Sequence, residues 1–581
     1  MPRASFFVIS ILFCCLSTCA QFCCAETPQN YEIFNDLKIP TSDGATISGM
    51  LVRPKDRQDA LPVIFQFTIY ARPQDRDLNS LKEAADRGYA GVIFYTRGKY
   101  LSTDEIWPYE HDAIDAYSAI DWISKQSWCN GSIGMYGGSY NGFTQWAATK
   151  HLHPALKTIV PMVAGRPGMG LPMENNIFIN PNYQWAFYVG NNRLLDEDIN
   201  NDRQRFRQLQ FKWWYSGRPY REIDKIDGQP NKWLQKWLQH PDYDAYWQAM
   251  TPQNQEFAQI TIPILTIDGY YNDSQVSSLD YLRQHLQHNP QAQHYLLIGP
   301  YGHFGAQRGG EASINDLAIH PKALFDAKEL IYGWFDHILK GKDRPALLKD
   351  RVNYFPIGES SWRHAPSLNA MTNATLRFYL NNRKRKHAYQ LSTLPPKQIG
   401  KLEQQVNFRD RNNSNNDYYP APIIRSQIDR SNGFVFVSEV LNEDMLINGA
   451  FSGEIMASIN KRDMDFGVTL YELTPEGKYF HLSYTIRRAS YTKDPSRRHL
   501  LTPYTITQLS LGQTRLISKR LKKGSRLLVY LNVNKNPFSQ LNFGSGKDAS
   551  DERLSDAKPD LKVKWFNTSF IDVPILRLRQ K

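Results

Sequence analysis

Cysteine is scarce in this chain and unevenly placed. Only 6 of the 581 residues are cysteine, and five of them lie within the first 25 positions. This segment has a basic residue at Arg3, an apolar run over residues 6–16 and small residues at Cys23-Cys24-Ala25, which is the pattern of a secretory signal peptide. Cleavage after Ala25 leaves Cys129 as the remaining cysteine, so an intramolecular disulfide and a cysteine-rich metal site are both excluded.

Long hydrophobic runs are also lacking. The run over residues 6–16 is too short for a transmembrane helix, and the rest of the sequence offers no other candidate. We therefore expect a secreted or periplasmic protein without an integral membrane span. Leu16-Ser17-Thr18-Cys19 resembles a lipobox with an atypical threonine, which makes lipoprotein anchoring the less favoured alternative.

Acidic residues are outnumbered by basic ones, and the formal net charge is +12. The basic residues are nevertheless scattered, and the one dense run, Arg383-Lys384-Arg385-Lys386, follows Asn381-Asn382 as in a polar hairpin tip. No segment resembles a nucleic-acid-binding module. We predict no nucleic-acid partner, and the sequence leaves homo-oligomerisation open.

The hydrophobic pattern divides the chain into three regions. Over residues 35–345, short apolar runs alternate with amphipathic segments, which predicts a mostly parallel sheet covered by helices on both faces. The alternation stops over about residues 165–259, a stretch rich in Trp, Tyr, Arg and Gln, which predicts a mainly helical cap. After about residue 350, short apolar runs between polar turns favour an antiparallel sandwich.

These regions give the predicted domains. They are a signal peptide at residues 1–25, an α/β domain at 26–345 that includes the cap, and a β-sandwich of jelly-roll type at 346–581. The predicted buried strands of the α/β domain are residues 61–68, 91–95, 133–136, 158–163, 262–267 and 295–298, with a clear helix at 324–339.

One serine is placed as a nucleophile. Ser139 stands in Gly137-Gly138-Ser139-Tyr140-Asn141-Gly142, between the predicted strand at 133–136 and a helical pattern at 143–150. A strand, a glycine-flanked serine and a helix make up a nucleophile elbow, in which the helix N-terminus points backbone N–H groups at the developing oxyanion. The sequence therefore predicts a hydrolase.

A serine hydroxyl needs a histidine as base and an acid to orient that histidine. In elbow-type hydrolases these follow in the order Ser, acid, His, each at the carboxyl end of a strand. The strand at 262–267 runs into Asp268-Gly269-Tyr270-Tyr271-Asn272-Asp273, and the strand at 295–298 runs into Gly299-Pro300-Tyr301-Gly302-His303. We predict a triad of Ser139, Asp273 and His303. The alternatives are an ordinary turn residue at Asp273 and a helix-capping role for Asp268.

Six motifs occur together along nearly the whole chain after residue 25. They resemble the motifs of the family of X-Pro dipeptidyl-peptidases, cocaine esterase and α-amino-acid ester hydrolases. The resemblance implies an α/β-hydrolase core, a helical cap and a C-terminal jelly roll, which is the organisation predicted above. The motifs are Arg97-Gly98, Trp128-Cys129-Asn130-Gly131, Gly134 to Gly142, Gly269-Tyr270-Tyr271, Ile298 to His303, and Trp334 to Gly341.

The resemblance also implies two oxyanion donors, the Tyr70 hydroxyl after an early strand and the backbone N–H of Tyr140. Two positions depart from the family pattern. Asn272 stands where the family usually has the acid, so that either Asp273 serves in its place or the acid is missing. Tyr95 replaces an aspartate that is common two positions before Arg97.

We therefore expect a serine hydrolase that transfers the acyl group of a small ester, amide or short peptide to water, without a metal or other cofactor. An esterase, an acylase or an α-amino-acid ester hydrolase is favoured over an X-Pro dipeptidyl-peptidase, because we identify no carboxylate or carbonyl cluster that would hold a substrate ammonium. An alternative of another class is a catalytically weak binding protein with a decayed hydrolase site, for which Asn272 is the main support.

Overall fold

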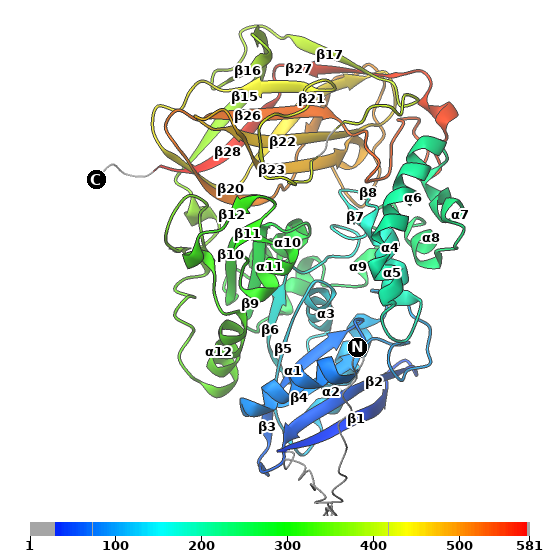
Figure 1. The fold of residues 1–581 in the computed structure, drawn as a ribbon, viewed down its shortest axis with the longest axis vertical. Helices are drawn as coiled ribbons and strands as arrows, with labels where there is room; N and C mark the ends of the chain where they lie inside the picture. Colours follow the sequence, from blue (N-terminus) through cyan, green and yellow to red (C-terminus); the bar gives the residue numbers. More distant parts are fainter. Residues whose placement is uncertain (1–29, 73, 416–417, 578–581) are drawn as a thin grey trace, which may run out of the picture.

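The computed structural model describes residues 30–577 except 73, 416 and 417. The predicted signal peptide at residues 1–25 therefore lies outside the described residues. An α/β part, coloured blue to green in Figure 1, lies below an all-β part coloured mainly yellow to red. A group of helices on one side extends from the first part to the second.

A ten-stranded sheet forms the centre of the α/β part. Its order is β1-β2-β4-β3-β5-β6-β9-β10-β13-β14, in which the strands from β4 to β13 are parallel and β1, β2 and β14 are antiparallel to their neighbours. All six predicted strands of this part are present. The bounds are β1 (Tyr31–Pro40), β2 (Thr46–Pro54), β3 (Leu61–Thr68), β4 (Ala90–Tyr95), β5 (Cys129–Gly138), β6 (Leu156–Met162), β9 (Ile264–Tyr271), β10 (His294–Gly302), β13 (Val352–Tyr354) and β14 (Arg363–Ala365).

Helices cover both faces of this sheet, as expected for parallel strands with near-continuous apolar runs. On one face lie α2 (Asp112–Ser124), α3 (Tyr140–Ala148) and α10 (Gln275–His288), and on the other lie α1 (Gln74–Asp86), α11 (His303–Arg308) and α12 (Ala327–Lys340). The predicted helix at 324–339 begins three residues late, because Asp326 caps α12 by accepting a hydrogen bond from the Glu329 N–H. Between α11 and α12 lie β11 (Ser313–Ile314), β12 (Leu317–Ala318) and the 3₁₀ turn η3 (Pro321–Ala323).

Strands β9 and β10 extend beyond their predicted ends at residues 267 and 298. The polar and glycine-rich residues after these positions suggested loops, but they remain paired between β9 and β10. Gly269 allows this, because it lets the backbone of β10 come close to β9. A Cβ there would lie 2.1 Å from the Tyr301 carbonyl oxygen. Asp268 is consequently part of a buried strand and does not cap α10, whose N-cap is Ser274.

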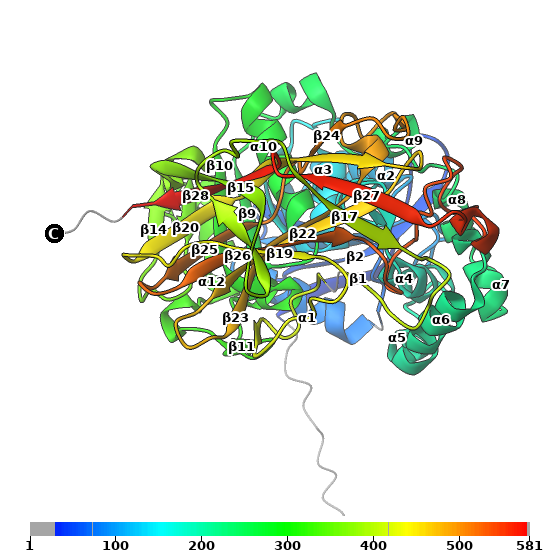
Figure 2. The same cartoon turned by 90° about the horizontal axis from the view of Figure 1, so that it is seen from above.

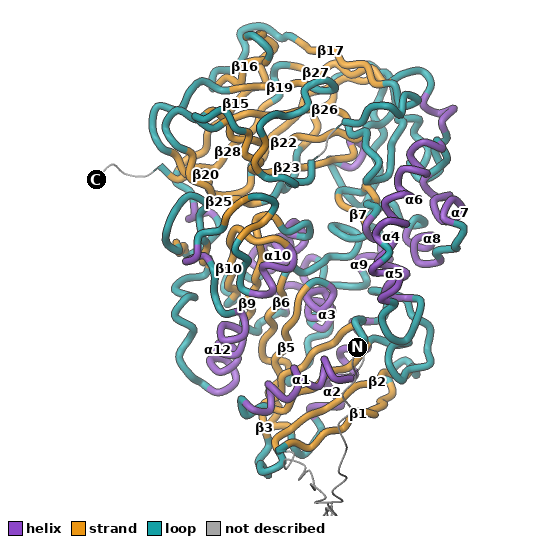
Figure 3. The backbone as a smooth tube through the Cα atoms, viewed as in Figure 1, coloured by secondary structure: helices purple, strands orange, loops and turns teal. Residues whose placement is uncertain are grey.

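The insertion between β6 and β9 is mainly helical (Figure 3). It also contains a short hairpin, β7–β8, which the sequence did not predict. The elements are β7 (Met173–Glu174), β8 (Ile177–Phe178), α4 (Pro181–Gly190), α5 (Glu197–Asn201), α6 (Arg203–Ser216), η1 (Tyr220–Glu222), α7 (Ile223–Asp227), α8 (Lys232–Trp237), α9 (Ala245–Gln248) and η2 (Asn254–Gln259).

In the described residues, the all-β part contains fourteen strands, which lie over the α/β part in the view of Figure 2. Strands β15 and β16 form a hairpin whose turn lies between Arg385 and Ala388, so the dense basic run is at its tip, as predicted. The predicted fold class is confirmed. The strands are β15 (Ala374–Arg385), β16 (Ala388–Ser392), β17 (Lys401–Val406), β18 (Ile424–Arg425), β19 (Phe434–Val437), β20 (Met445–Ala450), β21 (Ser452–Ile459), β22 (Asp465–Leu473), β23 (Tyr479–Arg488), β24 (Thr507–Ser510), β25 (Leu516–Leu521), β26 (Arg526–Val533), β27 (Leu561–Phe566) and β28 (Phe570–Leu576), with turns η4 (Asn369–Met371), η5 (Ala489–Tyr491) and η6 (Leu554–Ala557).

Candidate active site

Ser139 occupies a strained turn between β5 and α3, with φ 62° and ψ −120°. The turn is held by close packing on β6. A Cβ at Gly142 would lie 2.9 Å from the Cα of Ala164 and from the carbonyl oxygen of Met162, and the Ser139 N–H donates to that same oxygen at 3.0 Å. Because only small residues fit here, the serine is lifted out of the sheet beside the N-terminus of α3.

His303 is the first residue of α11, directly after β10. Its helix packs against the elbow, since a Cβ at Gly138 would lie 2.1 Å from the Oε1 of Gln307. The amide nitrogen of the same glutamine donates to the His303 carbonyl oxygen at 2.9 Å. Neighbouring elements at one edge of the sheet therefore carry the predicted base and the predicted nucleophile.

The imidazole Nδ1 of His303 faces two oxygens at once. It lies 2.8 Å from Oδ1 of Asn272 and 3.1 Å from Oδ1 of Asp273. Both oxygens are acceptors, so Nδ1 carries the proton and Nε2 of the neutral ring is free of one. The two positions that the sequence offered as alternatives for the acid thus contact the same nitrogen.

The negative charge of Asp273 and the positive charge of protonated His303 stabilise each other. Loss of hydration disfavours ionisation of both His303 and Asp273, but their mutual attraction and hydrogen bond outweigh it. The pKa of His303 is raised above its ordinary value, and the pKa of Asp273 is lowered to about 2. Asp273 is therefore a carboxylate at neutral pH, and the 54% exposure of its side chain is consistent with the charged form.

Asn272 is buried and is held from behind by Asp268. The Nδ2 of Asn272 donates to Oδ1 of Asp268 at 2.8 Å, and the same oxygen accepts the Gly269 N–H at 2.7 Å. Burial raises the pKa of Asp268 to about 6. The contact fixes the amide so that its oxygen faces the histidine, a supporting role that the sequence did not reveal. An aspartate four residues before the asparagine, within the strand that ends at Tyr271, was the available signal.

The two predicted oxyanion donors lie beside the serine. The Tyr70 hydroxyl interacts with the Ser139 side chain and with the backbone N–H of Tyr140, and it accepts a hydrogen bond from Trp185 Nε1 at 3.3 Å. Burial raises the pKa of Tyr70, which keeps the hydroxyl protonated and able to donate.

The cap adds an aromatic wall that the sequence did not assign to the site. Trp185 of α4 stacks on Tyr109 with ring centroids 5.4 Å apart and lies 5.8 Å from the Tyr140 ring. Tyr188, also on α4, lies 6.5 Å from the Tyr70 ring. The signal for it was the aromatic-rich stretch at residues 183–188 within the predicted cap.

Comparison with known proteins relates most of the chain to hydrolases. The profile of the X-Pro dipeptidyl-peptidase (S15 family) matches residues 43–305, and that of the X-Pro dipeptidyl-peptidase C-terminal non-catalytic domain matches residues 348–564. The cocaine esterase of Rhodococcus sp. (strain MB1 Bresler) is 24% identical over 568 residues, which cover 91% of this chain and 95% of the esterase. This chain belongs to the S15 family.

The S15 fold is also seen in solved structures that align with both domains. An aminopeptidase from the marine sediment archaeon Thaumarchaeota archaeon covers 94% of this chain and 97% of its own, with a TM-score of 0.77 and 18% identity. An α-amino acid ester hydrolase covers 96% of this chain and 100% of its own, with a TM-score of 0.73 and 20% identity. The predicted family is confirmed, and the protein is a serine hydrolase of the esterase or peptidase type.

Neither a metal-binding cluster nor a membrane-spanning helix is found in residues 30–577 without 73, 416 and 417. In that part of the S15 chain, no three His, Cys, Asp or Glu side chains are grouped so as to hold a metal ion. The helices described there are all too short or too polar to span a membrane.

Proposed function

We propose that this S15 hydrolase cleaves small esters by two-step acyl transfer, with Ser139 as nucleophile, His303 as general base and Asp273 as the charged partner of the histidine. The observation that carries the proposal is the approach of Asp273 Oδ1 to within 3.1 Å of His303 Nδ1. A carboxylate at this contact stabilises the imidazolium that forms during the reaction, which an amide cannot do to the same extent.

In the first step Oγ of Ser139 attacks the ester carbonyl carbon while its proton passes to Nε2 of His303. The carbonyl oxygen becomes negative and accepts hydrogen bonds from the Tyr70 hydroxyl and the Tyr140 N–H. The bond to the alcohol then breaks, and the alcohol leaves with the proton from His303. Water repeats the sequence on the acyl-enzyme, which releases the acid and restores the serine.

Ester cleavage is favoured over peptidase action because carboxylates near the site are already engaged. Recognition of a substrate ammonium requires an ionised carboxylate that is available to it. The Glu174 carboxylate makes two hydrogen bonds with Arg515, at 2.9 and 2.7 Å. Asp112 accepts from the Tyr140 hydroxyl at 2.7 Å, and burial raises its pKa to about 8, which favours the neutral acid at pH 7.

The aromatic wall indicates which esters fit. Trp185 and Tyr188 are partly exposed and lie next to the Tyr70 oxyanion donor, and such aromatic rings favour flat apolar groups on the acyl or alcohol side. We therefore expect aromatic esters to be better substrates than short aliphatic ones.

The test is a panel of p-nitrophenyl esters, amino-acid esters and X-Pro-anilides assayed with purified protein. We expect the p-nitrophenyl esters to have the highest kcat/KM, and a fluorophosphonate to label wild type but not Ser139→Ala. Faster cleavage of X-Pro-anilides would assign the protein to the peptidases. A folded protein that is not labelled would favour the decayed-site alternative.

A further inference from the structure

The loop that presents Asp273 is attached to the β-sandwich. We call residues 272–275 the acid loop. The carbonyl oxygen of Asp273 accepts a hydrogen bond from Nη2 of Arg515 at 3.0 Å. At the end of the loop, the Gln275 side chain donates to the Leu516 carbonyl oxygen at 3.0 Å and accepts the Leu516 N–H at 2.7 Å. Two successive residues of the sandwich thus hold both halves of the loop.

Arg515 itself is fixed on three sides. Its side chain is 4% exposed, it binds both carboxylate oxygens of Glu174, and its guanidinium carbon lies 4.0 Å from the centroid of the Tyr484 ring. A planar guanidinium with this many contacts has little freedom to move. The hydrogen bond to the Asp273 carbonyl therefore has a defined direction.

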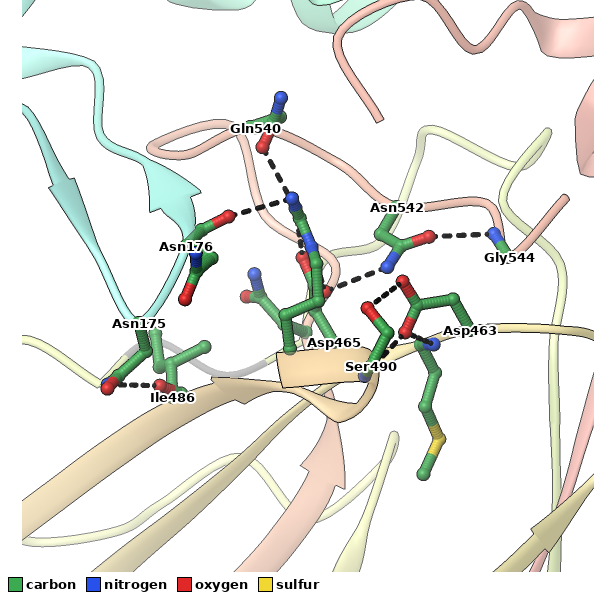
Figure 4. A network of polar contacts seen from close by, with 12 residues as sticks. Asn175, Asn176, Asp463, Asp465, Ile486, Ser490, Gln540, Asn542 and Gly544 are labelled. Atoms are coloured by element: carbon green, nitrogen blue, oxygen red, sulfur yellow. Dashed lines mark hydrogen bonds and ion pairs between the residues drawn. The ribbon is translucent and has the colours of Figure 1, made fainter. Parts of the chain in front are cut away.

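Glu174 is in turn held by a separate attachment of the cap hairpin. The next two residues, Asn175 and Asn176, form a turn with φ 52° and 63° that lies against the sandwich (Figure 4). Asn175 Nδ2 donates to the Ile486 carbonyl oxygen at 2.7 Å, and Arg488 Nη1 donates to the Asn176 carbonyl oxygen at 2.7 Å. Arg488 is bound to Asp465 and Gln540 within the sandwich, so the turn rests on a buried network of polar contacts.

We propose that Arg515 is a positioning residue for catalysis, through which the β-sandwich sets the direction in which Asp273 faces His303. The proposal rests on the assignment of Asp273 in the proposed function. The Asp273 side chain is half exposed, and its Oδ1 accepts the Ser274 N–H at 2.8 Å, so its orientation depends on the backbone of the loop and on the histidine that it faces. Removal of the Arg515 contact removes the hydrogen bond to the Asp273 carbonyl, leaves the bonds of Ser274 and Gln275 in place, and removes no group that touches substrate.

The main variant is Arg515→Met combined with Glu174→Gln, which removes both members of the ion pair together. Glu174→Gln alone keeps an amide oxygen that can accept a hydrogen bond from Arg515 and leaves the Arg515 side chain in place, so it is the first control. Arg498→Met is the second control, because Arg498 pairs with Asp463 at 2.9 Å inside the sandwich and its other hydrogen bonds go to Ser490, Gly546 and Lys547, away from the acid loop. Thermal unfolding of each variant shows whether it is folded.

The readouts are the kcat and KM for a p-nitrophenyl ester and the rate of Ser139 labelling by a fluorophosphonate. A small misplacement of a catalytic group costs up to about 100-fold. We expect the double variant to lose about 10- to 100-fold in kcat relative to Glu174→Gln, with KM changed less than about threefold. In an Asp273→Asn background the same pair of changes should lower kcat less than about threefold, since positioning no longer matters once the carboxylate is gone.

Three results would overturn the proposal while leaving the proposed function intact. The first is a folded double variant that keeps the kcat and labelling rate of Glu174→Gln. The second is a loss that is as large in the Asp273→Asn background as in wild type, and the third is an equally large loss in Arg498→Met. Failure of wild-type Ser139 to react with the fluorophosphonate would instead refute the proposed function, and this inference with it.

Discussion

The nucleophile elbow and the acid loop lie at the same edge of the sheet, but they are held in different ways. The elbow is fixed within the α/β domain, where Gly142 packs directly against Ala164. The acid loop is held partly within the same domain, by Ser274 and Gln275, and partly by Arg515 and Leu516, about 240 residues further along the chain. Contacts within one domain thus hold the nucleophile, whereas the acid loop has an additional support from the second domain.

This difference bears on the role of the second domain, whose matching profile covers residues 348–564. That profile is described as non-catalytic, and no sandwich residue is proposed to touch substrate. The sandwich nevertheless forms hydrogen bonds with the loop that carries the proposed acid. Substitutions in the two regions should therefore lower activity for different reasons. A change in the elbow removes the nucleophile, whereas a change in or beside the acid loop alters the orientation or the charge of Asp273.

The largest effect is expected at the elbow. Ser139→Ala removes the only proposed nucleophile, and we expect kcat for p-nitrophenyl esters to fall by at least about 10⁴-fold, as for other serine hydrolases. Steady-state assays with a folded-state control by circular dichroism measure this. Activity near the wild-type level would refute Ser139 as the nucleophile.

The next effect distinguishes the two residues that face His303. Asp273→Asn removes the charge that stabilises the imidazolium, and we expect a loss of about 10³- to 10⁴-fold in kcat. Asn272→Ala removes a neutral acceptor and should cost far less, about tenfold. The reverse ranking of the two kcat values would overturn the assignment of Asp273.

A smaller effect is expected at the oxyanion donors. Tyr70→Phe keeps the ring and its contacts but removes the hydroxyl that lies beside Ser139. We expect kcat to fall about 10²- to 10³-fold with little change in KM, which is the cost of one oxyanion donor. A rise in KM with unchanged kcat would instead indicate a role in substrate binding.

The smallest effect is expected at Asp268. Its hydrogen bond reaches the histidine through Asn272 and its charge is the last of the influences that raise the pKa of His303, and an asparagine in its place can still accept the Asn272 amide hydrogen bond. We expect Asp268→Asn to lower kcat less than about fivefold, in keeping with the loss of one charge-assisted hydrogen bond. A loss as large as that of Asp273→Asn would identify Asp268 as the acid instead.

The same contrast explains what could be predicted from the sequence. The elbow has a local signature, because small residues must surround Ser139, and the strand and helix beside it follow from apolar periodicity. The order of Ser139, Asp273 and His303 placed all three at one edge of the sheet. The predicted ends of β9 and β10 were wrong, because the glycine-rich sequence around Gly269 is typical of a loop although its residues are paired in the sheet.

The supporting contacts could not be predicted, since they join residues far apart in the chain. The sequence around Asp273 does not predict a contact with Arg515, and the sequence around Ser139 does not predict the nearby Trp185 ring of the cap. Asn272 suggested a missing acid, yet the structure places it and Asp273 against the same imidazole nitrogen. Such bifurcated contact depends on the backbone path of the loop, which a residue pattern does not define.

The most direct test of the account is the pH dependence of kcat/KM for wild type, Asp273→Asn and Asn272→Ala on one p-nitrophenyl ester. His303 must be neutral to accept the serine proton, and Asp273 raises its pKa above the ordinary value of 6.5, so activity should fall with decreasing pH around a midpoint above 6.5. Without the carboxylate the imidazolium loses its partner, and the midpoint of Asp273→Asn should move to lower pH, whereas Asn272→Ala should keep the wild-type midpoint. An unchanged midpoint in Asp273→Asn would contradict the claim that this residue is the charged partner of the histidine.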